Sequence, residues 1–223
     1  MKKFLIISIF FVLNVIAAAS ADSPDIEAVV GKVQENYEKI HSYHADFTQE
    51  AEVKALSTVQ KADGEVWFKK PGLMRWNYYK PNKDEIVSDG KSIWYYSAGE
   101  NQVIESPIEN MEGSDSSTTL LSGLGNLKKL FNYKFSSASA TDSSGNYLVD
   151  LSPREQDIEN FSKVTIMVDK KSYMVNRIFL YDPFGNTTTI NLKNLEINKN
   201  ISDSTFTFKK PKNAEIVKVP LKK

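Results

Sequence analysis

Apolar side chains recur at three- and four-residue intervals near the start of the chain and at two-residue intervals along most of the rest. The first spacing covers these positions: Ile26, Val29, Val30, Val33, Tyr37 and Ile40. It predicts one amphipathic helix that ends near residues 41–42. Ser23, Pro24 and Asp25 precede it, and such residues commonly cap a helix N-terminus. The apolar face of this helix must pack against another element.

Alternation of apolar and polar residues then predicts strands separated by short turns. The expected strands are residues 45–54, 59–70, 73–79, 84–88, 92–97, 102–106, 133–137, 147–152, 163–169, 174–181, 187–198 and 205–208. Asp89-Gly90 is typical of a two-residue type I′ hairpin, which pairs Ile86 with Ile93. We therefore expect one large antiparallel sheet of ten or so strands.

A helical insertion is predicted in the middle of the chain. Residues 112–119 are small and polar, and apolar residues then return at three- and four-residue intervals: Leu120, Leu121, Leu124, Leu127, Leu130 and Phe131. This spacing favours one or two short helices, interrupted at Gly123 and Gly125. No internal repeat and no linker divides the sequence, which indicates a single domain.

An aromatic stretch, GEVWFKKPGLMRWNYYKP at residues 64–81, dominates the first half of the predicted sheet. Successive side chains of a strand point to opposite faces, so its residues separate into two sets. One set, extended by the next hairpin, is Val66, Phe68, Met74, Trp76, Tyr78, Ile86, Ile93 and Tyr95. Trp94 and Tyr96 fall on the other face, unless a bulge reverses the assignment.

These eight side chains are either ordinary core or the wall of a ligand cavity. Large aromatic residues in strands are usually core. The two predicted helical segments, however, offer little apolar surface to fill the inside of a curved sheet of this size. The second interpretation is therefore a concave wall that surrounds an apolar ligand.

The first 21 residues, MKKFLIISIFFVLNVIAAASA, have the features of a secretory signal peptide. Lys2 and Lys3 form a basic start, an apolar run covers residues 4–19, and Ala-Ser-Ala ends at residue 21. The alternative is an uncleaved membrane anchor, but the run is shorter than the ~20 residues of a spanning helix. We expect cleavage after Ala21 and an exported domain of residues 22–223.

Cysteine usage and charge narrow the class of protein. The chain has no cysteine, which excludes disulfides and a lipid-modified N-terminus, so we expect a freely soluble periplasmic protein. Lys and Arg balance Asp and Glu at 28 each, which argues against nucleic acid as the main partner.

Catalytic chemistry is not indicated. His41 and His44 are the only histidines, and no motif marks a third metal ligand or a nucleophile near them. No phosphate-binding loop motif is present. We therefore predict that the protein is not an enzyme and uses no metal and no cofactor.

Four stretches carry a family resemblance: HSYHADFTQE (41–50), DGEVWFKKPGLMRWNYYKP (63–81), IVSDGKSIWYY (86–96) and FTFKKP (206–211). Together they resemble the periplasmic outer-membrane lipoprotein carriers, the LolA family, over nearly the whole chain. The resemblance implies an incomplete, open antiparallel β-barrel of about eleven strands with a lid of helices. It also implies three partners for a monomeric carrier: acylated lipoproteins, an inner-membrane lipoprotein-releasing ABC transporter, and an outer-membrane lipoprotein receptor.

The resemblance further implies a lid and a latch. Leu120, Leu121, Leu124 and Leu127 are the expected lid side chains. Members of the family usually have an arginine before the proline of an Arg-Pro turn, and it fixes the lid by hydrogen bonds to backbone carbonyls. Lys70 stands at that position here. It keeps the charge but has a flexible stem in place of a planar fork. We expect its ammonium to contact carbonyls near residues 120–127, the alternative being a solvated strand end.

One other function remains open at this level. A module that senses lipids or lipoproteins, rather than carrying them, can use the same open-barrel scaffold, because a fold does not fix a function.

Overall fold

The computed structural model describes residues 24–111, 124–154 and 162–221. The predicted signal peptide and two of the predicted lid residues, Leu120 and Leu121, lie outside these ranges. The predicted N-terminal helix is confirmed as α1 (Ile26–Lys39), and the Asp25 carboxylate caps it by accepting a hydrogen bond from the backbone N–H of Glu27 at 3.0 Å. The cap satisfies one of the free N–H groups at the helix start.

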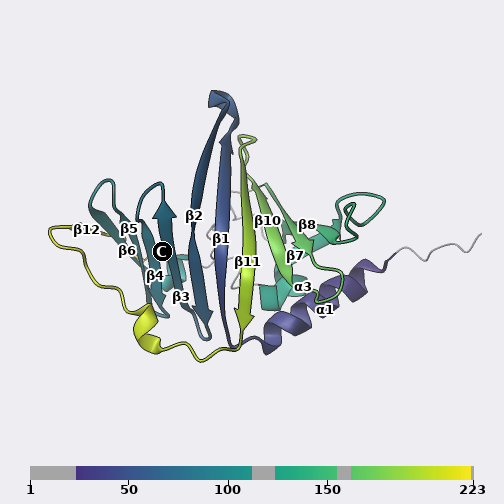
Figure 1. The fold of residues 1–223 in the computed structure, drawn as a ribbon, viewed down its shortest axis with the longest axis horizontal. Coiled ribbons are helices and arrows are strands. Elements are labelled where there is room, and N and C mark those ends of the chain that lie inside the picture. Colours follow the sequence, from purple (N-terminus) through teal and green to yellow (C-terminus); the bar gives the residue numbers. More distant parts are fainter. Residues whose placement is uncertain (1–23, 112–123, 155–161, 222–223) are drawn as a thin grey trace, which may run out of the picture.

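Twelve strands of the described chain form one sheet (Figure 1). They are β1 (Ser42–Val53), β2 (Thr58–Lys69), β3 (Leu73–Lys80), β4 (Glu85–Asp89), β5 (Ser92–Ser97), β6 (Gln102–Pro107), β7 (Phe131–Phe135), β8 (Tyr147–Pro153), β9 (Lys163–Val168), β10 (Val175–Tyr181), β11 (Thr187–Ile197) and β12 (Glu215–Lys218). Their order is β12-β6-β5-β4-β3-β2-β1-β11-β10-β9-β8-β7. All neighbours are antiparallel except β12 and β6. The predicted mainly-β fold is thus confirmed.

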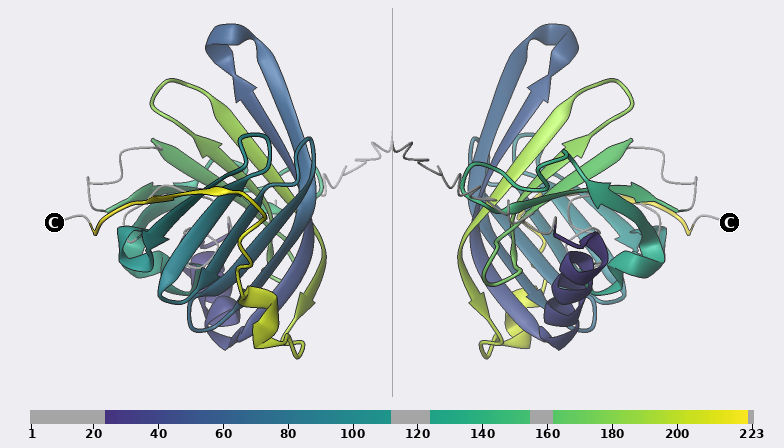
Figure 2. Two further views of the ribbon diagram at one scale, coloured as in Figure 1. Left: turned by 90° about the vertical axis from the view of Figure 1, so that its left-hand side faces the viewer. Right: turned by 90° about the vertical axis from the view of Figure 1, so that its right-hand side faces the viewer.

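The sheet is strongly curved and open, with β7 and β12 as its two edges (Figure 2). The helix α1 lies on its concave side, together with a short helical segment formed by η3 (Leu124–Asn126) and α3 (Leu127–Leu130). The long hairpin of β1 and β2, with η1 (Lys54–Leu56) at its tip, projects beyond the other strands (Figure 1). Two further short helical turns are η2 (Ile108–Met111) and η4 (Asp203–Phe206).

The C-terminal part of the chain differs from the prediction. Residues 205–208 do not form a strand: Ser202 caps the turn η4 by accepting from the N–H of Ser204, and the chain then crosses the convex face. Phe206 is buried there, and Phe208 stacks on Trp94 with ring centroids 5.5 Å apart. The apolar alternation that predicted a strand therefore reflects contact with the outside of the sheet. The strand β12 that follows was not predicted.

The hairpin at residue 89 also has a different register. Ile86 lies opposite Tyr95 and not opposite Ile93, because four residues form the turn. The Asp89 carboxylate accepts hydrogen bonds from the N–H groups of Lys91 and Ser92, which stabilises the longer turn. A shift of two residues leaves every side chain on its predicted face.

One hydrophobic cluster joins α1, the short helical segment and most strands. Its members come from both halves of the curved sheet and from the apolar face of α1, so one continuous core underlies the described chain.

Concave apolar face and the contacts of its covering helix

The eight predicted wall residues share one face of β2–β5. The register places Val66 opposite Trp76, and Trp76 opposite Ile86 on the next strand. Phe68 lies opposite Met74. The four residues on β2 and β3 that begin this wall are buried: Val66, Phe68, Met74 and Trp76. The other four wall side chains are more exposed. Tyr78, Ile86 and Ile93 are partly buried. Tyr95, on β5, is 40% exposed.

The strand β1 extends this wall, which sequence reasoning missed. Tyr43 stacks on Phe68 with centroids 5.3 Å apart, and Phe47 contacts the ring of Trp76 edge-on at 4.8 Å. Phe47 also meets Tyr78 edge-on at 5.0 Å. Offset and edge-on contacts are the favourable geometries for aromatic rings. These rings form one continuous aromatic surface across three strands.

The other half of the sheet completes the concave face with aliphatic side chains. Buried examples from β8 to β11 are Val149, Leu151, Val164, Ile166, Val168, Val175, Ile178, Ile190 and Leu192. Two-residue alternation in the sequence marks most of these positions, and an irregular register between Val175 and Arg177 interrupts it on β10. The apolar face thus spans nearly the whole sheet.

Two polar side chains interrupt the aromatic half of the wall. The Tyr78 hydroxyl donates to the amide oxygen of Gln49 at 3.3 Å, and burial raises the pKa of Tyr78 to about 12. The indole N–H of Trp76 is buried and has no hydrogen-bond partner within the described chain. Both groups are therefore neutral, and the face carries hydrogen-bonding capacity without charge.

The helix α1 is fixed to the β7–β11 half of the sheet by several side chains. The backbone N–H of Val175 donates to the hydroxyl of Tyr37 at 3.2 Å. Burial raises the pKa of Tyr37, so this hydroxyl stays neutral. Asn36 donates to the carbonyl of Ser172 at 2.7 Å, and Lys32 lies over the ring of Tyr173. These contacts hold α1 against the turn between β9 and β10.

The two predicted lid leucines within the described chain are both buried. Leu124 belongs to η3 and Leu127 to α3, and both join the hydrophobic cluster with α1. Gln34 of α1 accepts a hydrogen bond from the N–H of Lys128 at 3.1 Å. The short helical segment and α1 therefore cover the concave face together.

Lys70 occupies the position predicted for a latch, but its acceptors differ from the prediction. Its ammonium donates to the carbonyls of Tyr37 and Glu38, both at 2.9 Å, and not to the described part of the predicted 120–127 stretch. The last carbonyls of an α-helix have no partner within the helix and carry partial negative charge. The end of α1 thus offers the acceptors that the sequence alone did not locate. The N–H of Lys70 also donates to the carbonyl of His41, next to the helix end.

The fold and this face define an open half-barrel with an apolar interior covered by helices. Residues 38–209 match the family model described as outer membrane lipoprotein carrier protein LolA. The chain belongs to the LolA family.

Similar proteins agree with this assignment. An outer-membrane lipoprotein carrier protein of Bordetella avium is 29% identical over 204 residues, which cover 92% of this chain and 90% of that protein. One of Sodalis glossinidius is 33% identical over 114 residues, which span about half of each chain (51% and 53%). Among solved structures, a conserved protein of Thermus thermophilus superposes with a TM-score of 0.55 at 14% identity, covering 86% of this chain and 98% of that one. At that identity the likeness concerns the fold.

Across residues 24–111, 124–154 and 162–221, none of the helices has the length and apolar character required to span a membrane.

Proposed function

We propose that this protein is a periplasmic carrier that holds the acyl chains of lipoproteins against the concave face and delivers them to an outer-membrane receptor. The observation that carries the proposal is the continuous apolar face beneath helices that are tied down by a few polar contacts. The family description and the names of the relatives support it. They describe carriers, so a sensing module on the same scaffold is not favoured.

The energetics suit reversible binding. Burying one CH₂ group contributes about 0.8 kcal/mol, so acyl chains in water represent tens of kcal/mol of exposed apolar surface. In this structure the apolar side chains of α1 and those of Leu124 and Leu127 pack in the same hydrophobic cluster as the wall. A ligand that displaces them exchanges one apolar contact for another, which keeps the net affinity moderate. The carrier therefore needs no chemistry of its own, and we propose that it is not an enzyme.

Release by an inner-membrane ABC transporter and acceptance by an outer-membrane lipoprotein receptor belong to the same proposal. Transfer of a labelled lipoprotein between the two purified partners, with and without this protein, tests both partner assignments.

The exported form is expected to begin at Asp22, and N-terminal sequencing of protein from the periplasm checks this. A form that retains residues 1–21 in the membrane fraction argues against free diffusion between membranes.

Two adjacent tyrosines allow a matched test of the binding face. Tyr95 lies on the concave side and is 40% exposed, whereas Tyr96 points to the opposite side and its hydroxyl donates to Asn101. Tyr95→Glu places a charge in the path of acyl chains, and Tyr96→Glu places the same charge outside. We expect Tyr95→Glu to weaken binding of a triacylated lipopeptide by about tenfold or more, equivalent to about 1.4 kcal/mol.

Tyr96→Glu is expected to bind within about twofold of the unmodified protein, a difference of about 0.4 kcal/mol. Native mass spectrometry or displacement of a fluorescent fatty acid measures the affinity, and circular dichroism confirms that both variants are folded. Equal loss of binding in two folded variants overturns the assignment of the concave face. Failure of the unmodified protein to bind any acylated peptide overturns the carrier function itself.

A further inference from the structure

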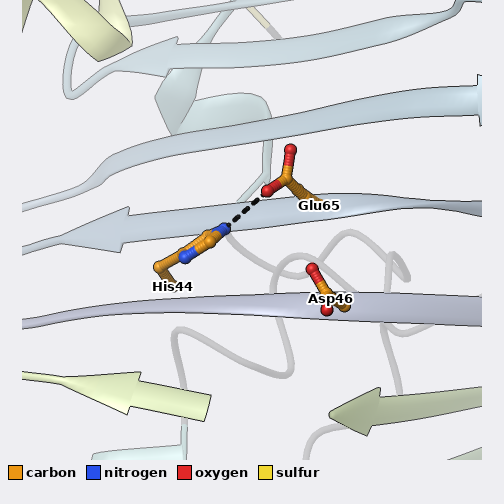
Figure 3. A group of neighbouring side chains, drawn as sticks. All are labelled: His44, Asp46 and Glu65. Atoms are coloured by element: carbon orange, nitrogen blue, oxygen red, sulfur yellow. Dashed lines mark hydrogen bonds and ion pairs between the residues drawn. The ribbon is translucent and has the colours of Figure 1, made fainter. Parts of the chain in front are cut away.

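The convex side of β1 and β2 carries a cluster of three metal-binding residue types, on the face opposite the proposed acyl site. Figure 3 shows His44 and Asp46 on β1 and Glu65 on β2. Their ligand atoms all lie within 4.8 Å of one another. Sequence spacing does not reveal the cluster, because Glu65 joins it through strand pairing and not through a local motif.

Two of these residues place like charges against each other. Asp46 and Glu65 are directly opposite in the antiparallel register of β1 and β2. Like charges in that position are destabilising unless a positive charge lies between them. His44, two residues before Asp46 on the same face, points its Nε2 at Glu65, with 3.0 Å between Nε2 and Oε1. The two carboxylates therefore have an imidazole nitrogen next to them that could serve as a third metal ligand.

Each of the three side chains is also held from outside the cluster. The second oxygen of Glu65 accepts from the hydroxyl of Tyr79, and Asp46 Oδ2 accepts from the amide of Asn194 at 2.6 Å. His44 Nδ1 lies 3.8 Å from a carboxylate oxygen of Glu196. Outer partners of this kind orient metal ligands and fix the histidine tautomer that coordinates.

The imidazole of His44 is restrained further by Trp67. The two rings stack with centroids 4.9 Å apart and an interplanar angle of 13°.

The cluster is partly buried but reachable by solvent, since the side chains of His44 and Glu65 are 24% and 27% exposed. Strands β1 and β2 lie in the middle of the sheet, so the backbone beneath the cluster is rigidly placed.

We propose that His44, Asp46 and Glu65 bind a divalent transition-metal ion of the zinc class, with water completing the coordination. One imidazole and two carboxylates are a common three-residue set for such ions. Magnesium and calcium prefer oxygen ligands alone, which makes them poorer matches. Ligand atoms about 2.0–2.2 Å from one zinc lie about 3–3.5 Å apart, so the 3.0 Å between His44 and Glu65 fits and rotation of Asp46 supplies the third ligand.

The bound ion joins β1 to β2 on the convex side and removes the repulsion between the two carboxylates. Because the ligands converge only in the folded chain, the ion stabilises the fold by mass action. This site is independent of acyl binding, and its presence or absence leaves the proposed carrier function untouched.

Zinc chloride alone is the probe, titrated by calorimetry into protein that carries no histidine tag. The expected result is one saturable site, together with a rise in melting temperature of about 5 °C at a zinc concentration about 100 times the Kd. His44→Ala and Asp46→Asn are expected to weaken zinc binding by at least about tenfold, since each removes a ligand.

The chain offers matched controls for both substitutions. His41→Ala removes the other histidine, and Glu50→Gln removes an exposed carboxylate of β1 that pairs with Lys61. Both are expected to bind zinc like the unmodified protein and to show the same rise in melting temperature. Circular dichroism confirms folding of all four variants. Absence of saturable binding, or an equal loss in His41→Ala, overturns the proposal and leaves the cluster as an ion-pair network alone.

Discussion

Gly64 lies where β2 shifts register against β3, in close contact with the backbone of its neighbour. A Cβ atom at this position would lie 1.9 Å from the carbonyl oxygen of Asn77 and 2.9 Å from the ring of Phe47. The absence of a side chain therefore permits two strands and an aromatic ring of the wall to meet at one point. Glycine within a strand commonly marks such a close approach.

We accordingly expect Gly64→Ala to lower the free energy of unfolding by about 3 kcal/mol, because the backbone of β3 must move to admit the methyl group. Gly31→Ala is the control, since a Cβ there meets only the flexible end of Lys128 at 3.5 Å. That change is expected to stabilise the protein by about 0.5–1 kcal/mol through helix propensity. Urea unfolding measures both. Equal changes in the free energy of unfolding for the two variants would contradict the close approach at Gly64.

Asp150 is a buried carboxylate on β8 whose charge depends on its neighbours. Burial raises its pKa, but hydrogen bonds from the hydroxyls of Ser136 and Thr165, both 2.6 Å long, and the charge of Lys163 outweigh burial and hold the pKa below its ordinary value. A lowered folded-state pKa contributes stability above the unfolded pKa, near pH 4, and this contribution is lost as the pH falls through the folded value.

Asp150→Asn is therefore expected to destabilise the protein by about 1 kcal/mol at pH 7, with a difference from the unmodified protein that shrinks steadily below about pH 4. Thermal unfolding followed from pH 7 to pH 3 measures it. Glu50→Gln, on an exposed carboxylate, serves as the reference with little effect across that range. A difference that stays constant down to pH 3 would show that the carboxylate charge is not what stabilises β8.

At the scale of elements, α1 is held mainly by apolar contacts toward β7–β11 and by polar contacts toward β2. Toward β7–β11 it is held by buried apolar side chains and by Tyr37, whereas toward β2 the ammonium of Lys70 binds its terminal carbonyls. The apolar contacts lie beneath the helix, and the contact with Lys70 lies at its exposed end. The contact with Lys70 therefore restrains the C-terminal end of α1 on the β2 side.

Lys70→Leu is expected to weaken the closed position of α1 by about 1–2 kcal/mol, since two hydrogen bonds and a favourable charge at the helix end are lost. That corresponds to a factor of about 5–30 in the ratio of closed to open forms. Hydrogen exchange of the amides of α1 measures the opening. Under the carrier proposal, this variant also passes cargo to the receptor more slowly, because closure no longer drives release.

Lys70→Arg is the control for this element. It retains the positive charge and adds donors in a planar fork, so protection of α1 is expected to equal or exceed that of the unmodified protein. If Lys70→Leu shows unchanged protection in α1, the side chain is only a solvated strand end.

The sequence predicted which side chains share a face better than it predicted which residues meet. Trp76 and Tyr78 lie on one side of β3 because the side-chain period of a strand is two, whatever the turns do. The same period kept Ile86 and Tyr95 together although the turn between them was longer than expected. Alternation therefore encodes the face of each side chain locally, except where an irregular register interrupts a strand, as between Val175 and Arg177 of β10.

Contacts between distant segments were not predictable in this way. The acceptors of Lys70 depend on where α1 ends in space, and the approach of Glu65 to His44 depends on the register between β1 and β2. Alternation of Phe206 and Phe208 with polar residues predicts a strand over residues 205–208, yet the apolar partner of these two rings is the outside of the sheet. Alternation indicates which side chains are buried, but not which part of the structure buries them.

At the scale of the whole molecule, a single apolar cluster links both halves of the sheet through β1. We therefore expect one cooperative unfolding transition. The tryptophans at positions 67, 76 and 94 all lie in the β2–β5 half, so their fluorescence reports on that half, while far-ultraviolet circular dichroism reports on the entire sheet. Coincident denaturation curves are the expected result. Separate transitions would show that the two halves fold independently.

The open sheet also affects how copies of the protein associate in solution. A closed barrel has no free strand edges, but here β7 and β12 both end the sheet, and such edges invite pairing with other chains. Both edge strands are short, and both are charged: Lys134 lies within β7, while Glu215 and Lys218 begin and end β12. Charges on an edge strand disfavour pairing with another chain, so we expect these side chains to oppose strand exchange between copies. Solubility of this protein should therefore depend on salt more strongly than its balanced overall charge suggests.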